Sequence, residues 1–303
     1  MKCSSKGPNR KRTSLVWSVL WWGLVFFVVI YGLIMFFEHK FIYFPSQFPE
    51  GDWQPWDESA VRSGIDPLVE DCYLTTADGV KLHGWYCQMS RKETDEPRAV
   101  LLWFHGNAGN ITHRYDTIVE LLRFGIDVFI VDYRGYGRSL GKPSEAGLYL
   151  DAEAAWDFLV NHRKITANRI VLFGRSLGGA VAIELAHRPQ IQPAGLIIES
   201  SFTSVPAMAS SILPILPGFL VRTKMDSINK VDKIPVPKLF VHSIDDEIIP
   251  YRHGRKLLAR ASEPKKFYKI EGAGHNETEF YGGRPYFNAL ERFIESCVDS
   301  SPK

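Results

Sequence analysis

Ser176 is the residue whose setting points most directly to chemistry. It lies in Gly174-Arg175-Ser176-Leu177-Gly178-Gly179, after a short apolar run and before a helix-prone one. A nucleophile elbow requires this order: a strand, then Gly-x-Ser-x-Gly, then a helix. The alternative interpretation is an ordinary Gly-rich turn between a strand and a helix. Small residues on both sides of the serine let strand and helix approach around a strained turn. The pattern predicts a nucleophilic hydroxyl at the C-terminal edge of a sheet.

His275 is the candidate general base. A serine hydroxyl is a poor nucleophile alone, so it needs a base that removes its proton and an acid that orients this base. His275 lies in Gly272-Ala273-Gly274-His275-Asn276, after the last predicted strand, and the glycines are expected to let its ring swing. His105 belongs to a different loop, and the other histidines lie in tails, helices or strand ends.

Three carboxylates are candidates for the orienting acid. Asp245 and Asp246 follow the predicted strand Lys238–His242, and Glu199 ends the strand before it. Asp246 is favoured because it lies inside the turn that redirects the chain into the next helix. Glu199 and Asp245 are expected to accept hydrogen bonds from nearby backbone amides instead.

The glycine-containing loop His105–Asn110 is the candidate oxyanion loop. It follows the continuous apolar run Ala99–Phe104, and its glycines allow backbone N–H groups to converge on one point. The N–H groups of Asn107 and Leu177 are therefore predicted to form the oxyanion hole. The conspicuous stretch Asp132–Ser139 is interpreted as a structural turn whose charged residues anchor loops around the site.

Strands that alternate with helices must position these residues. Val69–Thr75 and Val80–Cys87 alternate apolar and polar residues around a short turn, which predicts a β-hairpin. Further strands are predicted at 99–104, 127–131, 170–173, 194–198, 238–242 and 266–270, and helices at 112–124, 146–161, 180–186, 253–261 and 286–298. This order predicts an α/β fold: a mostly parallel sheet with helices on both faces and the hairpin at one edge.

One insertion interrupts the alternation of strands and helices, between the strands at 194–198 and 238–242. Its stretch Pro206–Val221 is apolar and broken by prolines. We interpret it as a cap over residues 200–236. It either packs on the core or forms a short lid over an apolar acyl pocket, and both can hold at once.

The N-terminal segment predicts a membrane anchor. Leu15–Phe37 holds no charge and would span roughly 35 Å as a helix, enough for a bilayer core of about 30 Å. A core helix would show a polar face, and a signal peptide would have a shorter apolar region with a cleavage site. Residues 1–14 carry five bases and no acid. The positive-inside rule thus places the N-terminus in the cytosol and the large domain in a lumen or outside the cell.

Two further features bear on this topology. Cys72 and Cys87 flank the predicted hairpin and could pair in an oxidising lumen, but two free buried thiols are the favoured interpretation. N-glycosylation sequons begin at Asn110 and Asn276, beside the predicted site, where a glycan would obstruct it. A lumenal domain therefore requires that both asparagines are too buried to be modified, which is the interpretation favoured here.

Together these stretches resemble the α/β-hydrolase superfamily, and within it the membrane-anchored group with alpha/beta hydrolase domain-containing protein 13 and the Bem-type yeast proteins. The resemblance covers roughly residues 41–298 and rests on the stretches at 43–45, 104–111, 132–137, 147–151, 174–183 and 274–276. It implies a serine hydrolase with the triad Ser176, Asp246 and His275, in the chain order of this fold. Relatives in this group resemble palmitoyl-protein thioesterases, which implies an ester or thioester substrate.

The sequence thus predicts a basic tail (1–14), a transmembrane signal anchor (15–37), a linker (38–65) and an α/β-hydrolase domain (66–299). Its expected partners are the membrane and a lipid-like ester or acylated protein. The sequence points to no cofactor or metal. A net charge of +2 without a basic patch argues against nucleic acid. A catalytically silent scaffold or binding protein with this fold is the alternative, but it would lack a triad member, and none is missing.

Overall fold

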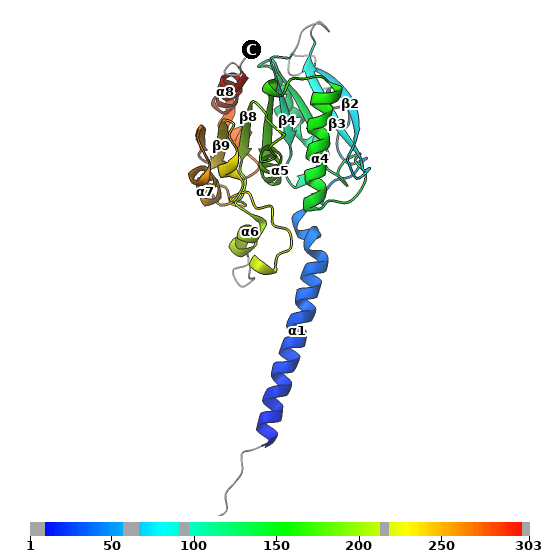
Figure 1. Ribbon diagram of the computed structural model, residues 1–303, viewed down its shortest axis with the longest axis vertical. Coiled ribbons are helices and arrows are strands. Elements are labelled where there is room, and N and C mark those ends of the chain that lie inside the picture. The colour runs from blue at the N-terminus through cyan, green and yellow to red at the C-terminus, as the bar shows by residue number, and fades with distance from the viewer. Residues whose placement is uncertain (1–9, 57–66, 91–96, 213–217, 299–303) are drawn as a thin grey trace, which may run out of the picture. The chain divides into compact units, whose positions relative to one another are not determined.

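In the computed structural model, which describes residues 10–56, 67–90, 97–212 and 218–298, the apolar runs of the sequence form one eight-stranded sheet (Figure 1). The strand order is β10-β9-β8-β7-β4-β6-β3-β2. The strands are β2 (Pro67–Thr75), β3 (Lys81–Met89), β4 (Ala99–Phe104), β6 (Ile126–Val131), β7 (Ile170–Arg175), β8 (Gly195–Glu199), β9 (Lys238–Ser243) and β10 (Lys265–Ile270). The hairpin β2–β3 is antiparallel, and β3 also pairs with β6 in an antiparallel manner. All other pairs of this sheet are parallel, which confirms the predicted mostly parallel sheet with the hairpin at one edge.

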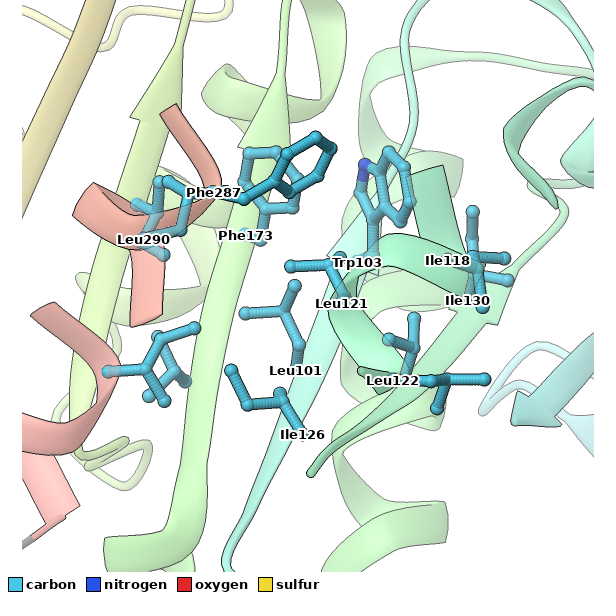
Figure 2. Close-up of a cluster of buried hydrophobic side chains, with 14 of the residues drawn as sticks. Leu101, Trp103, Ile118, Leu121, Leu122, Ile126, Ile130, Phe173, Phe287 and Leu290 are labelled. Atoms are coloured by element: carbon cyan, nitrogen blue, oxygen red, sulfur yellow. The ribbon is translucent and has the colours of Figure 1, made fainter. Parts of the chain in front are cut away.

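Helices cover both faces of this sheet. They are α3 (Tyr115–Leu122), α4 (Glu145–Asp157), α5 (Leu177–Ala186), α6 (Val205–Ile212), α7 (Arg252–Arg260) and α8 (Thr278–Val298), with short turns η1 (Ile111–Arg114), η2 (Phe158–His162), η3 (Ala167–Arg169), η4 (Gly218–Leu220) and η5 (Val231–Lys233). Alternate residues of β4 and β7, among them Trp103 and Phe173, pack under α3 and α8, as Figure 2 shows. Helices α4 and α5 pack on each other over the opposite face (Figure 1). Central strands such as β4 and β7 are therefore buried on both sides, which explains the continuous apolar runs in their sequences.

The parallel strands of the sheet end at the same edge, where the loops with the predicted site residues emerge. Ser176 follows β7, the oxyanion loop follows β4, Asp246 follows β9 and His275 follows β10. In parallel sheets the crevice outside the carboxyl ends of the strands is the usual place for a ligand. The predicted fold is thus confirmed, and it brings four segments that lie far apart in the chain to one edge.

The second compact unit of the chain begins at Tyr43, so part of the predicted linker belongs to it. The short strand β1 (Phe44–Pro45) pairs in parallel with β5 (Ala108–Gly109). Trp53 is 9% exposed and lies against Trp85 of β3, with ring centroids 5.9 Å apart. The sequence placed the start of the domain at residue 66, because prolines and aromatics without periodicity give no strand or helix signal. Residues 57–66 lie outside the described part of the chain.

The first compact unit contains the apolar helix α1 (Arg10–Ile42). Its stretch Val16–Leu33 has 18 residues, none of them buried by protein. That stretch alone is about 27 Å long. A helix that is apolar on all sides and not covered by protein suits a bilayer. Within the described residues it is the one helix long and apolar enough to cross a membrane. It continues beyond the predicted end at Phe37, and the first nine residues of the basic tail lie outside the description.

The predicted cap between β8 and β9 consists of α6, η4, η5 and the segments around them, with residues 213–217 outside the description. Its C-terminal part is held by Glu145, whose carboxylate accepts hydrogen bonds from the amides of Lys224 and Met225, both at 2.7 Å. Met225 is fully buried. This part packs on the core, whereas Ile212 at the end of α6 is 68% exposed.

The described cysteines of the domain, Cys72, Cys87 and Cys297, are buried and form no disulfide with one another. Cys72 lies opposite Gly84 in the hairpin, and Cys87 lies opposite Val69, so the two thiols are out of register. Burial raises the pKa of both of these thiols above the ordinary value. The structure therefore agrees with the favoured interpretation of free thiols.

Candidate active site

The turn at Ser176 has the strained geometry of a nucleophile elbow. Ser176 has φ 56° and ψ −118°, a backbone conformation that residues other than glycine rarely adopt. Its N–H donates to the carbonyl of Glu199 at 2.8 Å, which fixes the turn against β8. A Cβ on Gly174 would overlap the backbone of Gly178, and one on Gly178 would overlap the carbonyl of Phe104. The two glycines are therefore needed for strand β7, helix α5 and strand β4 to approach one another.

A continuous hydrogen-bonded chain joins the three predicted triad residues. His275 Nε2 lies 3.1 Å from Ser176 Oγ, and His275 Nδ1 lies 2.8 Å from Asp246 Oδ2. All three residues are less than 10% exposed. Since a carboxylate can only accept, Nδ1 carries the proton, and Nε2 is free to accept the proton of the serine hydroxyl.

Asp246 is held as a carboxylate by more than one donor. Its Oδ1 accepts hydrogen bonds from the amides of Ile248 and Ile249 at 3.0 and 2.7 Å. His242 Nε2 lies 3.4 Å from Oδ2, beside His275. Burial raises the pKa of Asp246, but the hydrogen bonds from His242 and His275 outweigh it and hold that pKa well below its ordinary value. The carboxylate of Asp246 therefore stays charged and oriented toward the ring of His275.

The loop that carries His275 is fixed on both sides of this residue. The N–H of His275 donates to Glu247 Oε2 at 3.0 Å, and its carbonyl accepts from Arg175 Nη2 at 3.1 Å. The glycines of this loop were expected to let the ring swing. With both backbone groups held, motion of the ring is left to its own side-chain torsions. Sequence reasoning missed Glu247 and Arg175, although Arg175 lies inside the elbow motif.

Glu199, the alternative acid, has a different role from the one expected. Among the described residues, no backbone amide donates to its carboxylate. Instead, the buried carboxylate accepts from Tyr286 Oη at 2.5 Å and Thr278 Oγ1 at 2.6 Å, and it lies 3.3 Å from Arg175 Nε. Burial lowers the pKa of Arg175, but Glu199 and Glu279 outweigh this and raise it. Glu199 thus neutralises the guanidinium that holds the carbonyl of His275.

Asp245, the other alternative acid, behaves as predicted. Its Oδ2 accepts the N–H of Gly272 at 2.6 Å, which ties the turn after β9 to the start of the His275 loop. Ser243 Oγ donates to the carbonyl of Ala273 at 2.6 Å in the same loop. These contacts position the base from its N-terminal side.

Removing the charge of Glu199 is expected to destabilise the protein. Arg175 and Glu199 are both almost fully buried, so Glu199→Gln leaves a buried guanidinium short of a counter-charge and should cost about 3 kcal/mol of unfolding free energy. Thermal unfolding of the full chain in detergent measures this. Glu271→Gln, at an exposed glutamate, is the matched control and should change stability by less than about 0.5 kcal/mol. Equal melting temperatures for the two variants would contradict the prediction.

The predicted oxyanion loop lies against the nucleophile. A Cβ on Gly106 would sit 3.6 Å from the Cβ of Ser176, and Leu177 is the first residue of α5, whose N–H has no partner within the helix. The carbonyl of Gly106 accepts from His105 Nδ1 at 2.7 Å. Burial lowers the pKa of His105 to about 3, so its ring is neutral.

The stretch Asp132–Ser139 anchors loops, as predicted. Asp132 Oδ1 accepts the N–H of Ile111, just after the oxyanion loop, at 3.0 Å. The guanidinium of Arg134 binds Asp151 of α4 through Nε at 2.9 Å and Asp78 of the hairpin turn through both terminal nitrogens, at 2.8 and 3.0 Å. This turn therefore ties the hairpin, α4 and the oxyanion loop together.

The two sequons differ in exposure. Asn110 is fully buried, and its amide donates to the carbonyls of Ser46 and Glu50, so a glycan does not fit the fold there. Asn276 is exposed, next to His275. The expectation that both asparagines are buried was therefore wrong for Asn276, because the loop turns the residue after the base toward solvent while Thr278 faces inward to Glu199.

A mostly parallel sheet with a serine at a nucleophile elbow, and a histidine and an aspartate on neighbouring strand ends, defines an α/β-hydrolase. The chain belongs to this family. It is 33% identical over 305 residues to alpha/beta hydrolase domain-containing protein WAV2 of Arabidopsis thaliana, which covers 94% of this chain and 97% of WAV2. It is also 33% identical over 283 residues to protein bem46 of Schizosaccharomyces pombe, covering 91% of each chain. The predicted resemblance to Bem-type proteins is thus confirmed.

Two further similarities support a hydrolase fold. Residues 95–225 match the family described as serine aminopeptidase, S33. The solved structure of the Pyrococcus furiosus esterase Pf2001 is similar with a TM-score of 0.67, covers 85% of this chain and 98% of the esterase, and is 19% identical. At that identity the likeness shows the fold alone. The chain is therefore a member of a hydrolase family with an esterase-like fold.

Proposed function

We propose that this protein is a membrane-anchored serine hydrolase that cleaves ester or thioester bonds. Ser176 acts as nucleophile, His275 as general base and Asp246 as the acid that orients the base. The observation that carries the proposal is the hydrogen-bonded chain from Ser176 through His275 to Asp246, with the serine at a strained turn. Strain of this kind costs about 1–3 kcal/mol and persists where the surrounding structure enforces it, commonly at active sites.

The geometry supports acyl transfer in two steps. As Oγ of Ser176 attacks the acyl carbon, Nε2 of His275 takes the hydroxyl proton and then gives it to the leaving alcohol or thiol. An acyl ester on Ser176 remains. Water, deprotonated by His275, attacks this ester, and the protonated ring returns its proton to Oγ as the carboxylic acid leaves. The amides of Asn107 and Leu177 stabilise the oxyanion in both steps, each contributing on the order of 10²–10³ in kcat.

Apolar side chains beside the acid and the base support a lipid-like acyl substrate. Ile248, two residues after Asp246, is 47% exposed, and Phe280, five residues after His275, is 82% exposed. Ile212, at the end of α6 in the cap, is also exposed. Large exposed apolar residues next to a site commonly contact an apolar ligand or a membrane. A long-chain acyl ester, or a palmitoylated protein, fits these surroundings and the apolar helix α1.

Activity-based labelling tests the proposal directly. The full chain in native membranes should react with a fluorophosphonate at Ser176. A matched pair of palmitoyl substrates, one a thioester and the other an oxygen ester, then separates the two leaving-group classes. A series of esters from acetyl to palmitoyl should show kcat/KM rising with chain length. Folded protein that remains unlabelled would overturn the proposal and leave a silent scaffold.

The proposal includes a topology, with the N-terminus in the cytosol and the domain in a lumen or outside the cell. The five basic residues among residues 1–14 support this orientation, whereas the exposed sequon at Asn276 argues against it, because a lumenal glycan there would obstruct the site. Sealed microsomes treated with protease from the cytosolic side should protect the domain. Complete digestion would contradict the orientation. In the protected case, Asn276→Gln shows whether the exposed sequon carries a glycan.

A further inference from the structure

The segment that follows α1 directly is bound to the candidate oxyanion loop. We call residues Tyr43–Glu50 the strap. Its backbone runs between the loop after β4 and the loop after β6, and its amides and carbonyls bond to both. These hydrogen bonds are Phe44 N–H to Asn107 O at 2.9 Å, Ser46 N–H to Gly109 O at 3.1 Å, Gly137 N–H to Ser46 O at 2.9 Å and Phe48 N–H to Gly137 O at 2.9 Å. The strap therefore joins two loops that belong to different strands.

Side chains reinforce the position of the strap. Tyr43 is only 5% exposed, and the amide of Gln47 donates to the carbonyl of Gly135 at 3.2 Å. From the oxyanion loop, the amide of Asn110 donates back to two carbonyls of the strap, those of Ser46 and Glu50. The strap is thus held from both neighbouring loops.

The bond from the strap to Asn107 bears on the amide that the oxyanion hole needs. A peptide unit is planar, so the N–H of Asn107 points opposite to the carbonyl of Gly106, which the ring of His105 holds. The next peptide unit is held through the carbonyl of Asn107, which accepts from the N–H of Phe44 and from Tyr136 Oη at 2.8 Å. Both peptide units around Asn107 are therefore fixed, one by its own loop and the other by the strap and Tyr136.

We propose that the strap is a positioning element of the oxyanion hole, which makes the segment next to the membrane helix part of the catalytic apparatus. The chain leaves α1 at Ile42, and the N–H of Phe44, two residues later, binds the oxyanion loop. This inference rests on the proposed function. If the Asn107 carbonyl is released, the amide of Asn107 loses its fixed direction, and a misplaced oxyanion donor lowers kcat without changing ground-state binding.

Two kinds of variant of the full chain test the proposal. Phe44→Pro removes the N–H that binds Asn107, and Phe44→Ala removes only the half-exposed ring. The ratio of the two kcat values therefore isolates the contribution of the N–H. Tyr136→Phe removes the second donor to the same carbonyl without touching the backbone. Tyr86→Phe is its matched control, because it removes a buried hydroxyl that donates to Asp127 of β6. We expect kcat to fall about 10-fold or more in Phe44→Pro relative to Phe44→Ala, and in Tyr136→Phe, with KM unchanged. The double variant should approach the 10²- to 10³-fold loss of one oxyanion donor.

A transition-state analogue separates positioning from general loss of structure. A long-chain trifluoromethyl ketone forms a tetrahedral adduct whose oxyanion needs the hole, whereas the fatty acid product binds as a ground-state ligand. Affinity for the ketone should fall by the same factor as kcat/KM, and affinity for the fatty acid should stay constant. Equal ketone affinity in Phe44→Pro and Phe44→Ala overturns the proposal, and so does equal kcat in these two variants.

Failure of this inference can be told from failure of the proposed function. A wild-type protein that neither binds a fluorophosphonate nor hydrolyses any acyl substrate refutes the hydrolase itself. If the wild-type protein is active and the strap variants are equally active, only the proposed role of the strap in positioning the oxyanion hole is refuted. If Phe44→Pro does not fold, which its melting curve shows, Ser46→Pro against Ser46→Ala takes its place, because Ser46→Pro removes the N–H of the strap that binds Gly109.

Discussion

Replacing Ser176 by alanine is expected to lower kcat about 10⁶-fold and to abolish fluorophosphonate labelling. The variant keeps His275, Asp246 and the oxyanion amides but has no oxygen that can form the acyl-enzyme. Substrate binding does not depend on the hydroxyl, so the dissociation constant for the fatty acid product should stay constant. Single-turnover kinetics with a palmitoyl thioester measures the loss, and Ser210→Ala, at an exposed serine of α6, is the control. A Ser176→Ala protein with more than a few per cent of wild-type activity would contradict this assignment.

The strained backbone at Ser176 predicts that replacing this residue by glycine stabilises the protein, although the same replacement removes the nucleophile. Its φ of 56° is strained for any residue with a Cβ, so Ser176→Ala keeps the strain while Ser176→Gly releases it. Ser176→Gly is expected to raise the unfolding free energy by about 1 kcal/mol relative to Ser176→Ala. Chemical denaturation of both variants in detergent measures the difference. A less stable glycine variant would mean that the turn is not strained.

Replacing Asp246 by asparagine is expected to lower kcat about 10⁴-fold while KM changes little. An amide at this position can donate to Nδ1, which favours the tautomer with the proton on Nε2, and that ring cannot accept the proton of Ser176. The neighbouring Asp245→Asn is a matched control, because Asp245 binds the N–H of Gly272 and does not contact the ring. If Asp245→Asn lost as much activity as Asp246→Asn, the assignment of the acid would be wrong.

The same carboxylate predicts a pH dependence of stability. The pKa of Asp246 lies below its ordinary value, so its contribution to stability is fully present above the unfolded pKa of about 4 and is lost as the pH falls further. The stability lost between about pH 5 and about pH 2 should therefore be smaller in Asp246→Asn than in the wild type. Denaturation curves at both pH values measure this. An equal loss in both proteins would show that the pKa of Asp246 is not lowered by folding.

The fold was largely predictable because its signals are local. Buried parallel strands such as β4 and β7 read as continuous apolar runs, and the elbow glycines mark a turn that other residues cannot form. The strap was not predictable as part of the domain, since it has no periodicity and the hydrogen bonds that tie it to the two loops join residues 60 or more positions apart. Such contacts leave no pattern in the neighbouring sequence.

The sequence by itself determined the kinds of groups at the candidate site: a serine at a nucleophile elbow, a histidine in a glycine-containing loop and carboxylates after the preceding strands. It could not choose between Glu199 and Asp246 by chemistry, because both are carboxylates at strand ends. The tertiary structure gives the two carboxylates different partners. It surrounds Glu199 with Arg175, Tyr286 and Thr278, and it leaves Asp246 facing His275.

Exposure was also a tertiary property. Asn110 and Asn276 belong to equivalent sequons, yet one is buried under the strap and the other faces solvent. The physical reason is general: residue type and spacing specify what a side chain can do, whereas its partners come from segments that only the folded sheet brings to one edge.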